Sequence, residues 1–232
     1  MNKTKWIVFS VATIGILGLL IFFSTSNRLD VSNIDASIIQ VANSQDGNIG
    51  DHIYGKVGSA VTLIEYGDFQ CPGCGAFHPT MKAIAEQYKG QLQFVFRNFP
   101  LTTAHANAKA AAGVAEAAGL QGKYWEMHNK IYETQSAWSE LSGTERTDLF
   151  TSYARELGLD VDKFNTDIAT KDVTAKINYD YALGKKINVD ATPSFYLNGV
   201  KIENSTWGDK AKFTAVIDAE LTKAGIALPA AN

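Results

Sequence analysis

The chain has 232 residues, of which 46% are hydrophobic and 19% charged, and a net charge of −3. This length and apolar fraction suffice for one packed domain with an insertion, or for two closely associated subdomains. The slightly acidic balance, without a basic stripe interleaved with aromatic residues, argues against nucleic acid as a partner. Cys71 and Cys74 are the only cysteines, so neither can form a structural bridge to a third thiol.

The N-terminus carries an uncharged apolar run from Trp6 to Phe23, preceded by Lys3 and Lys5. As a helix the run would be about 27 Å long at roughly 1.5 Å per residue. That length nearly spans a hydrocarbon core of about 30 Å. We therefore predict one transmembrane helix within residues 1–26.

Retention of this helix as an anchor is favoured because Phe22–Ser26 lacks the Ala-x-Ala pattern of a cleavage site. The lysines before the helix place the N-terminus in the cytoplasm and the rest of the chain outside the cell membrane. Cleavage as a signal peptide is the alternative, and it would give a secreted or periplasmic protein. Either location is oxidising, which suits a protein with two cysteines.

Residues 27–50 are rich in Ser, Asn, Asp and Gln and predict a polar linker, with one short strand at Ile38–Val41. Val61–Tyr66 has apolar residues at both odd and even positions, as expected for a strand in a sheet that helices cover on both faces. A helix follows over Ala76–Tyr88, and Leu92–Phe96 supplies the next strand. Strand, helix and strand form a compact parallel unit, with the cysteine pair at the helix N-terminus.

A block of helices is predicted next, over Thr102–Leu120, Lys123–Gln135, Thr144–Leu157, Val161–Thr170 and Val173–Ile187. Asn198-Gly199 between two apolar runs then predicts a β-hairpin, and Lys210–Ala224 a closing helix. The expected organisation is α/β, with an α-helical subdomain (102–188) inserted between two parts of one domain (51–101 and 189–227) and a short tail (228–232).

A pair such as Cys71-Pro72-Gly73-Cys74 can serve a zinc site, haem attachment, an inert disulfide or redox exchange. Zinc needs four ligands, usually from a second cysteine pair or closely spaced histidines, and the chain has neither, so we expect no metal. Attachment of c-type haem needs a histidine after the second cysteine, where this chain has Gly75. An inert disulfide closing so short a loop would remove little entropy from the unfolded chain. Redox chemistry is the interpretation that the pattern favours.

A helix N-terminus stabilises a thiolate through its unpaired N–H groups and its dipole. Cys71, the first residue of the motif, is therefore the expected nucleophile, and Cys74, one turn inside, the more buried resolving thiol. Pro72 suits the start of a helix and stiffens the ring. Gly73 adds neither charge nor a hydrogen bond, which leaves the oxidising strength undetermined.

Two further features accompany the motif. Glu65 is a carboxylate in an apolar strand, and it is either a strand-edge residue reaching water or a buried acid that exchanges protons with Cys74. Thr192-Pro193 begins a strand, where proline is tolerated although it cannot donate a ladder hydrogen bond. His78 is expected to be helix scaffolding, and His105 and His128 packing or surface residues.

Several stretches together resemble the DsbA family of thiol-disulfide oxidoreductases, which have a thioredoxin fold with a helical insertion. The resemblance covers about Asp51 to Leu221. It is carried by Glu65–Cys74 with Phe77-His78-Pro79, Phe96–Leu101, Gln121–His128 and Ala191–Phe195. It implies that Cys71 is the nucleophile, Cys74 its partner and Glu65 the buried acid. It also implies that Pro193 is cis and forms, with Thr192, the wall that holds a substrate peptide.

The resemblance implies a membrane-anchored oxidase that introduces disulfides into secreted or envelope proteins. It needs no cofactor beyond the Cys71–Cys74 disulfide. A quinone-linked membrane partner of the DsbB or vitamin K epoxide reductase type would reoxidise it. Strong oxidants of the family have histidine where this chain has Gly73. A disulfide reductase or isomerase therefore stays an alternative, as does a non-enzymatic peptide-binding module with a structural disulfide.

Overall fold

A computed structural model of the chain describes residues 13, 15 and 29–230. They fall into two units, 1–33 and 34–232, and all strands and helices discussed below belong to the second. Among the described residues, no helix has the length and apolar character needed to cross a membrane. Apart from Thr13 and Gly15, the predicted anchor lies outside the described residues.

Five strands of the second unit form one sheet in the order β1-β3-β2-β4-β5. β2 and β3 are parallel, and the other neighbours are antiparallel. The bounds are β1 Ile53–Gly55, β2 Thr62–Gly67, β3 Gln93–Asn98, β4 Ser194–Leu197 and β5 Val200–Ile202. β2 lies at the centre and every one of its residues is buried, as the apolar pattern on both parities predicts. β1 was not predicted, because three residues are too few to show a periodicity.

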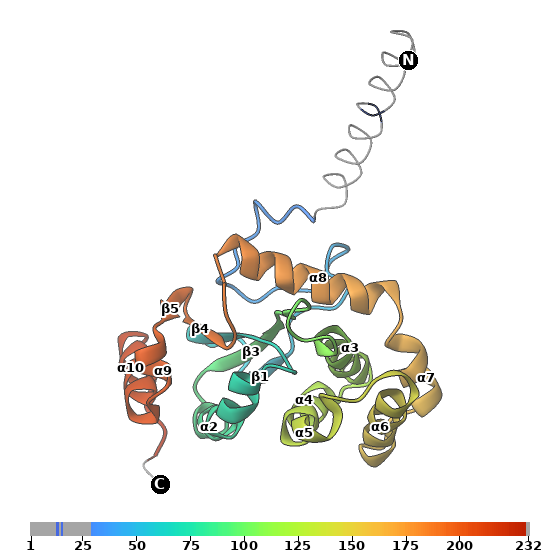
Figure 1. The fold of residues 1–232 in the computed structure, drawn as a ribbon. Coiled ribbons are helices and arrows are strands. Elements are labelled where there is room, and N and C mark those ends of the chain that lie inside the picture. Colours follow the sequence, from blue (N-terminus) through green and yellow to red (C-terminus); the bar gives the residue numbers. More distant parts are fainter. Residues whose placement is uncertain (1–12, 14, 16–28, 231–232) are drawn as a thin grey trace. The chain divides into compact units, whose positions relative to one another are not determined.

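Helices separate and follow the strands. The bounds are α2 Pro72–Tyr88, α3 Ala108–Gly119, α4 Tyr124–Glu133, α5 Gln135–Trp138, α6 Gly143–Glu156, α7 Val161–Asp167, α8 Lys171–Lys186, α9 Asn204–Trp207 and α10 Lys210–Lys223. α3 to α8 lie between β3 and β4 in the chain, where the helical block was expected (Figure 1). The predicted helix over Lys123–Gln135 is interrupted at Thr134, whose φ of −113° and ψ of 20° are not helical.

Both faces of the sheet are covered, as predicted. On one face α2 and α10 pack against Leu63, Phe195 and Leu197. On the opposite face lies α8, whose Asp180 accepts hydrogen bonds from the backbone and side-chain N–H groups of Asn98 at 3.1 and 3.0 Å. Figure 1 shows α8 running beside α3, away from α10. The sheet therefore separates two apolar layers. Because successive side chains of a strand point to opposite faces, alternate residues contribute to alternate layers.

The prediction of a polar linker over 27–50 is wrong for residues 34–50, because this segment is bound to the sheet. The carbonyl groups of Ala36 and Ile38 accept hydrogen bonds from the Arg97 guanidinium at 2.6 and 2.7 Å. Gln40 accepts one from the Tyr179 hydroxyl at 3.0 Å. The strand expected at Ile38–Val41 is absent: the Ile38 carbonyl binds the Arg97 guanidinium, and the Gln40 carbonyl accepts the N–H of Asp51 rather than that of a neighbouring strand. Composition alone does not distinguish such a segment from a solvated linker.

A network of buried charges holds this segment in place. Arg97 is paired with Asp51 at 2.7 Å, and Lys176 with Asp51 and Asp180 at 3.1 and 2.8 Å. These four side chains are at most 1% exposed. Burial opposes each charge, but the adjacent opposite charges keep the Asp51 pKa well below and the Lys176 pKa well above their usual values. Asp51, Arg97 and Lys176 are consequently ionised, whereas burial raises the pKa of Asp180 to about 6.

Candidate active site

The two cysteines lie at the start of α2, just after the loop that follows β2. Cys71 is the N-cap of α2 and has extended backbone angles, φ −64° and ψ 122°, while Pro72 occupies the first turn. Cys74 lies one turn inside the helix. Both are free thiols in the structure, and their exposed fractions are 9% for Cys71 and 1% for Cys74. The position at a helix N-terminus, and the deeper burial of the second cysteine, agree with the sequence-based expectation.

The two thiols differ strongly in acidity. A hydrogen bond from the Cys74 thiol, supported by the backbone N–H groups of Cys74 and Gly73, lowers the pKa of Cys71 to about 5. Burial raises the pKa of Cys74 well above its usual value, and the hydrogen bond to Cys71 adds to this effect. At neutral pH the site therefore holds a thiolate on Cys71 beside a protonated Cys74. This division assigns nucleophile and resolving thiol by electrostatics.

Thr192 and Pro193 face the cysteines from the start of β4. The peptide bond between them is cis, as the family resemblance implies. The Thr192 carbonyl lies 3.4 Å from Cys71 Sγ, 121 residues apart in the chain. A Cβ atom on Gly73 would lie 3.7 Å from Cys71 Sγ and 3.8 Å from Pro193 Cδ, which is ordinary contact distance. Position 73 thus has room for a side chain at the edge of the site.

Glu65 lies on the face of β2 that α2 covers. Its neighbours in register are Phe96 and Phe195, and its exposed fraction is 5%. Because β2 is central, Glu65 is not the strand-edge residue reaching water that the sequence allowed. Burial, and to a lesser degree the negative charge of Cys71, raise the pKa of Glu65 to about 8. A carboxyl group that is protonated at neutral pH is thus available near the thiols.

The loop before Cys71 is tied to the inserted helices. The Asp68 carboxylate accepts hydrogen bonds from the Leu101 N–H and contacts His105 Nδ1, both at 2.8 Å. Gln70 donates to the Ser139 carbonyl at 2.7 Å. Gln135 donates to the carbonyl groups of Phe69 and Cys71, at 2.8 and 2.9 Å. These contacts were not predicted, because the partners are 33 to 69 residues apart and no periodicity links them.

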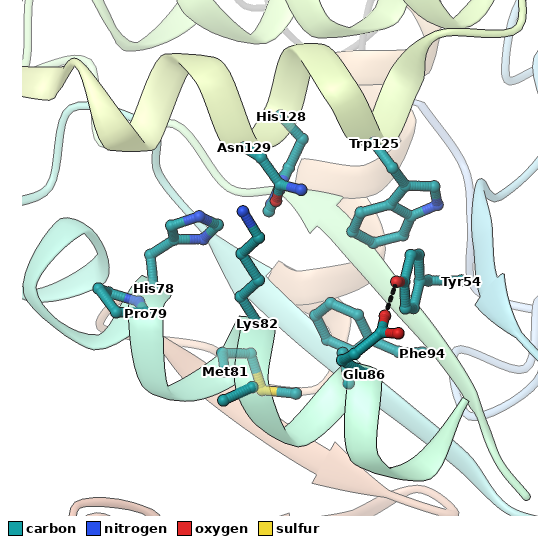
Figure 2. A pocket seen from close by; sticks show the side chains of 12 residues that line it. Tyr54, His78, Pro79, Met81, Lys82, Glu86, Phe94, Trp125, His128 and Asn129 are labelled. Carbon is teal, nitrogen blue, oxygen red and sulfur yellow. Dashed lines mark hydrogen bonds between the residues drawn. The ribbon is translucent and has the colours of Figure 1, made fainter. Parts of the chain in front are cut away.

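A pocket of about 370 Å³ lies between α2 and α4. Its lining is mostly apolar and consists of Tyr54, His78, Pro79, Met81, Lys82, Ala83, Ala85, Glu86, Phe94, Trp125, His128 and Asn129. Figure 2 shows the rings of Trp125, Phe94 and Tyr54 on one side and His78 on the other, with Tyr54 hydrogen-bonded to Glu86. His78 and His128 are buried, and burial lowers their pKa values to about 4 and about 3. Both are neutral packing groups, as the sequence predicts for His128.

No group of three or more His, Cys, Asp or Glu side chains among the described residues is arranged to hold a metal ion. The sequence-predicted residues Cys71, Cys74, Glu65, Thr192 and Pro193 instead converge on one place, at the end of β2 and the start of α2 and β4. The arrangement has what dithiol-disulfide exchange requires: an acidic thiol, a buried partner thiol and a protonated acid.

Comparison with known proteins supports this chemistry. Residues 47–219 match the family model described as thioredoxin. The probable disulfide bond formation protein D of Bacillus cereus is 30% identical over 222 residues, which cover 94% of this chain and 95% of that protein. The structure of alpha-DsbA1 from Wolbachia pipientis aligns with 27% identity and a TM-score of 0.63, over 75% of this chain and 92% of that chain.

A second group of relatives is much longer. Na(+)/H(+) antiporter NhaA 1 of Salinispora arenicola is 36% identical over 149 residues, which are 64% of this chain but only 22% of the antiporter. This chain therefore spans about a quarter or less of those proteins. The disulfide-formation relative is matched over nearly its full length. The chain belongs to the thioredoxin family and, within it, to the DsbA-like proteins.

Proposed function

We propose that the chain is an extracytoplasmic dithiol oxidase that introduces disulfides into secreted or envelope proteins. The observation that carries the proposal is the pairing of an acidic Cys71 thiol, with a pKa of about 5, with a buried Cys74 whose pKa is raised. A stabilised thiolate favours the reduced protein, and a reduced form that is stable makes the disulfide form a good oxidant.

The reaction starts from the Cys71–Cys74 disulfide. A substrate thiolate attacks Cys71 Sγ, the S–S bond breaks, and Cys74 leaves as a thiolate. Glu65, which is protonated at neutral pH because its pKa is raised to about 8, supplies the proton that Cys74 takes up. Thr192 and Pro193 hold the substrate peptide against the mixed disulfide. The low pKa of Cys71 makes it a good leaving group in the next step.

A second substrate thiolate then attacks the substrate sulfur of the mixed disulfide. A substrate disulfide forms, and Cys71 leaves as a thiolate. Two electrons have passed from the substrate to Cys71 and Cys74, so a reoxidising partner must remove them before the next turnover. We propose a quinone-linked membrane protein of the DsbB or vitamin K epoxide reductase type for this role, with residues 1–26 as a membrane anchor for this chain.

The direction of electron flow is tested by trapping thiols in intact cells. We expect Cys71 and Cys74 to be predominantly oxidised at steady state, and a predominantly reduced pair would contradict the oxidase proposal. A Cys74→Ser variant is the matched control, because it cannot resolve mixed disulfides and should accumulate covalent complexes with thiol-containing substrates. Deletion of the reoxidising partner should shift the wild-type pair to the reduced state.

A reductase or isomerase is the second candidate, and Gly73 is the observation that favours it, because it supplies no charge to stabilise the thiolate. Equilibration with glutathione separates the two: a strongly reducing potential favours the reductase. A non-enzymatic binding module would keep its biological activity after both cysteines are replaced by serine, and the oxidase would lose it.

A further inference from the structure

We propose that Gln135 is a positioning residue for the active site. Because Gly75 has no side chain, it leaves space for the Gln135 amide to reach the loop that carries Cys71. The inference rests on the proposed function only in taking Cys71 as the nucleophile. Gln135 belongs to the inserted helices and lies 64 residues after Cys71, so the insertion would act directly on the reactivity of the thiol.

The Gln135 side chain spans the residues on both sides of Gln70. Its Nε2 atom donates to the carbonyl of Phe69 at 2.8 Å and to that of Cys71 at 2.9 Å. An amide nitrogen has two hydrogens, and both are used here. The Cys71 carbonyl also accepts the N–H of Gly75 at 3.1 Å, the first bond of the α2 ladder. One side chain thus fixes the last residues of the loop to the first turn of the helix.

Gly75 leaves the room that this amide occupies. It lies inside α2, where glycine costs roughly 1 kcal/mol relative to alanine. A Cβ atom at this position would lie 2.3 Å from Gln135 Oε1, 2.7 Å from its Cδ and 2.9 Å from its Nε2. These distances leave no space for both, so any side chain at position 75 would displace the amide. Gly75 and Gln135 are therefore a matched pair.

The amide is held on a rigid element. α5 is anchored by Trp138, whose ring is fully buried and packs against Phe150 with ring centroids 5.4 Å apart. Trp138 Nε1 donates to the Ile131 carbonyl at 2.8 Å, which ties α5 back to α4. Because the anchor is in the core, Gln135 transmits a fixed position to the active-site loop rather than following it.

The position it fixes is the one on which the acidity of Cys71 depends. The Cys71 pKa is lowered mainly by the hydrogen bond from the Cys74 thiol, and further by the backbone N–H groups of Cys74 and Gly73. Small rotations of the Cys71 backbone would move the sulfur out of line with these donors. Removing the Gln135 amide frees that rotation, so the thiolate should lose part of its stabilisation.

The test compares the reduced wild-type protein with Gln135→Met, which keeps the length of the side chain and removes both donors. We expect the Cys71 pKa, measured by pH-dependent alkylation and thiolate absorbance, to rise by about one unit, a tenfold change in the thiolate-to-thiol ratio. The equilibrium with glutathione should become about tenfold less oxidising. An unchanged pKa and an unchanged equilibrium in the folded variant would overturn the proposal.

Two further variants separate positioning from general stability. Gln121→Met is the matched control, because Gln121 also makes two backbone contacts, with the N–H and the carbonyl of Asp160 at 2.9 and 3.1 Å, but lies away from the thiols. It should leave the Cys71 pKa unchanged even if stability falls. Gly75→Ala should raise the pKa as Gln135→Met does. The double variant should be no worse than either single one, since the two act as a unit; additive effects would overturn the pairing.

These measurements do not depend on the direction of electron flow. If trapping in cells shows a reduced pair, the oxidase proposal fails, while the shift in Cys71 pKa on Gln135→Met still reports on positioning. If the pair is oxidised in cells and the pKa does not move, the positioning proposal alone fails.

Discussion

The buried ionisable groups on the two faces of the β2–β3 pair differ in whether they have partners of opposite charge. On one face, Arg97, Asp51 and Lys176 are almost completely buried, and each has an opposite charge within 3.1 Å. On the other face, Glu65 is buried and neither a hydrogen bond nor a cation from the described residues offsets its burial. The difference teaches that pairing makes a buried group structural, whereas burial without a partner leaves a group whose proton can move near neutral pH.

The largest expected effect comes from breaking the paired face. Arg97→Met leaves Asp51 and two carbonyl groups without their main donor, and should lower the free energy of unfolding by about 3 to 5 kcal/mol, measured by urea denaturation. Lys123→Met is the control, because Lys123 pairs with Glu126 on the surface, where a salt bridge contributes about 0 to 1 kcal/mol. Equal losses in the two variants would contradict the distinction between the faces.

A smaller effect should follow from tightening the same face. Gly184 in α8 faces the sheet, and a Cβ atom there would lie 2.6 Å from Phe99 and 3.0 Å from Tyr66. Gly184→Ala should therefore destabilise the protein by about 1 to 3 kcal/mol through overpacking, although alanine favours helix. Gly113→Ala in α3, where the nearest atoms would be 3.5 Å away, should be neutral or stabilising. Thermal denaturation of both variants would show whether the packing argument holds.

The unpaired face is tested by the pH dependence of stability in the reduced protein. The Cys71 pKa falls on folding to about 5, so its contribution to stability grows as pH rises from about 5 to its unfolded value of 9. The Glu65 pKa rises on folding from 4.5 to about 8, so its contribution is lost over pH 4.5 to 8. Between about pH 5 and 8 the two slopes oppose each other and nearly cancel.

Glu65→Gln should remove the opposing slope of Glu65 and leave that of Cys71, which adds to the slope that His78 and His128 contribute below about pH 6.5. The stability of the reduced variant should therefore increase with pH up to about pH 8. Urea titrations at several pH values measure this, and Glu65→Gln with Cys71→Ser is the control, in which unfolding should take up about one proton fewer between pH 5 and 8. A flat profile in the single variant would show that Glu65 and Cys71 do not both titrate as inferred.

The smallest effect on stability is expected at position 73. Gly73→His introduces a side chain where a Cβ atom meets only ordinary contacts, so the free energy of unfolding should change by less than about 0.5 kcal/mol. When protonated, the imidazole should lower the Cys71 pKa further and make the protein more oxidising. The glutathione equilibrium measures this, and Gly73→Ala separates the charge from the added bulk.

Much of this comparison could be predicted from the sequence. Apolar residues at both odd and even positions of Val61–Tyr66 predicted a strand buried on both faces. The position of Cys71 after this strand predicted a helix N-terminus. Glu65 could be identified as a candidate but not as buried, because burial depends on β3 and β4, which pair with β2 from distant parts of the chain. Likewise, the resemblance implied the cis bond before Pro193, whereas the contact of the Thr192 carbonyl with Cys71 needed the fold.

The paired face was not predictable in the same way. Arg97 and Lys176 are ordinary charged residues in the sequence, and their partners are the side chains of Asp51 and Asp180 and two backbone carbonyls. A carbonyl carries no sequence signal, so the segment that supplies it was mistaken for a linker. Gln135 was missed for the same reason, because it too binds backbone atoms far along the chain.

The attachment of residues 34–50 has a practical meaning for where the protein can be shortened. A version that starts at Asp51, the boundary that composition suggests, removes the Ala36 and Ile38 carbonyls and leaves Arg97 donors buried without acceptors. A version that starts at Ile34 keeps them. The folded unit therefore begins at Ile34, 17 residues before Asp51, and cooperative unfolding of the longer version alone would mark that boundary.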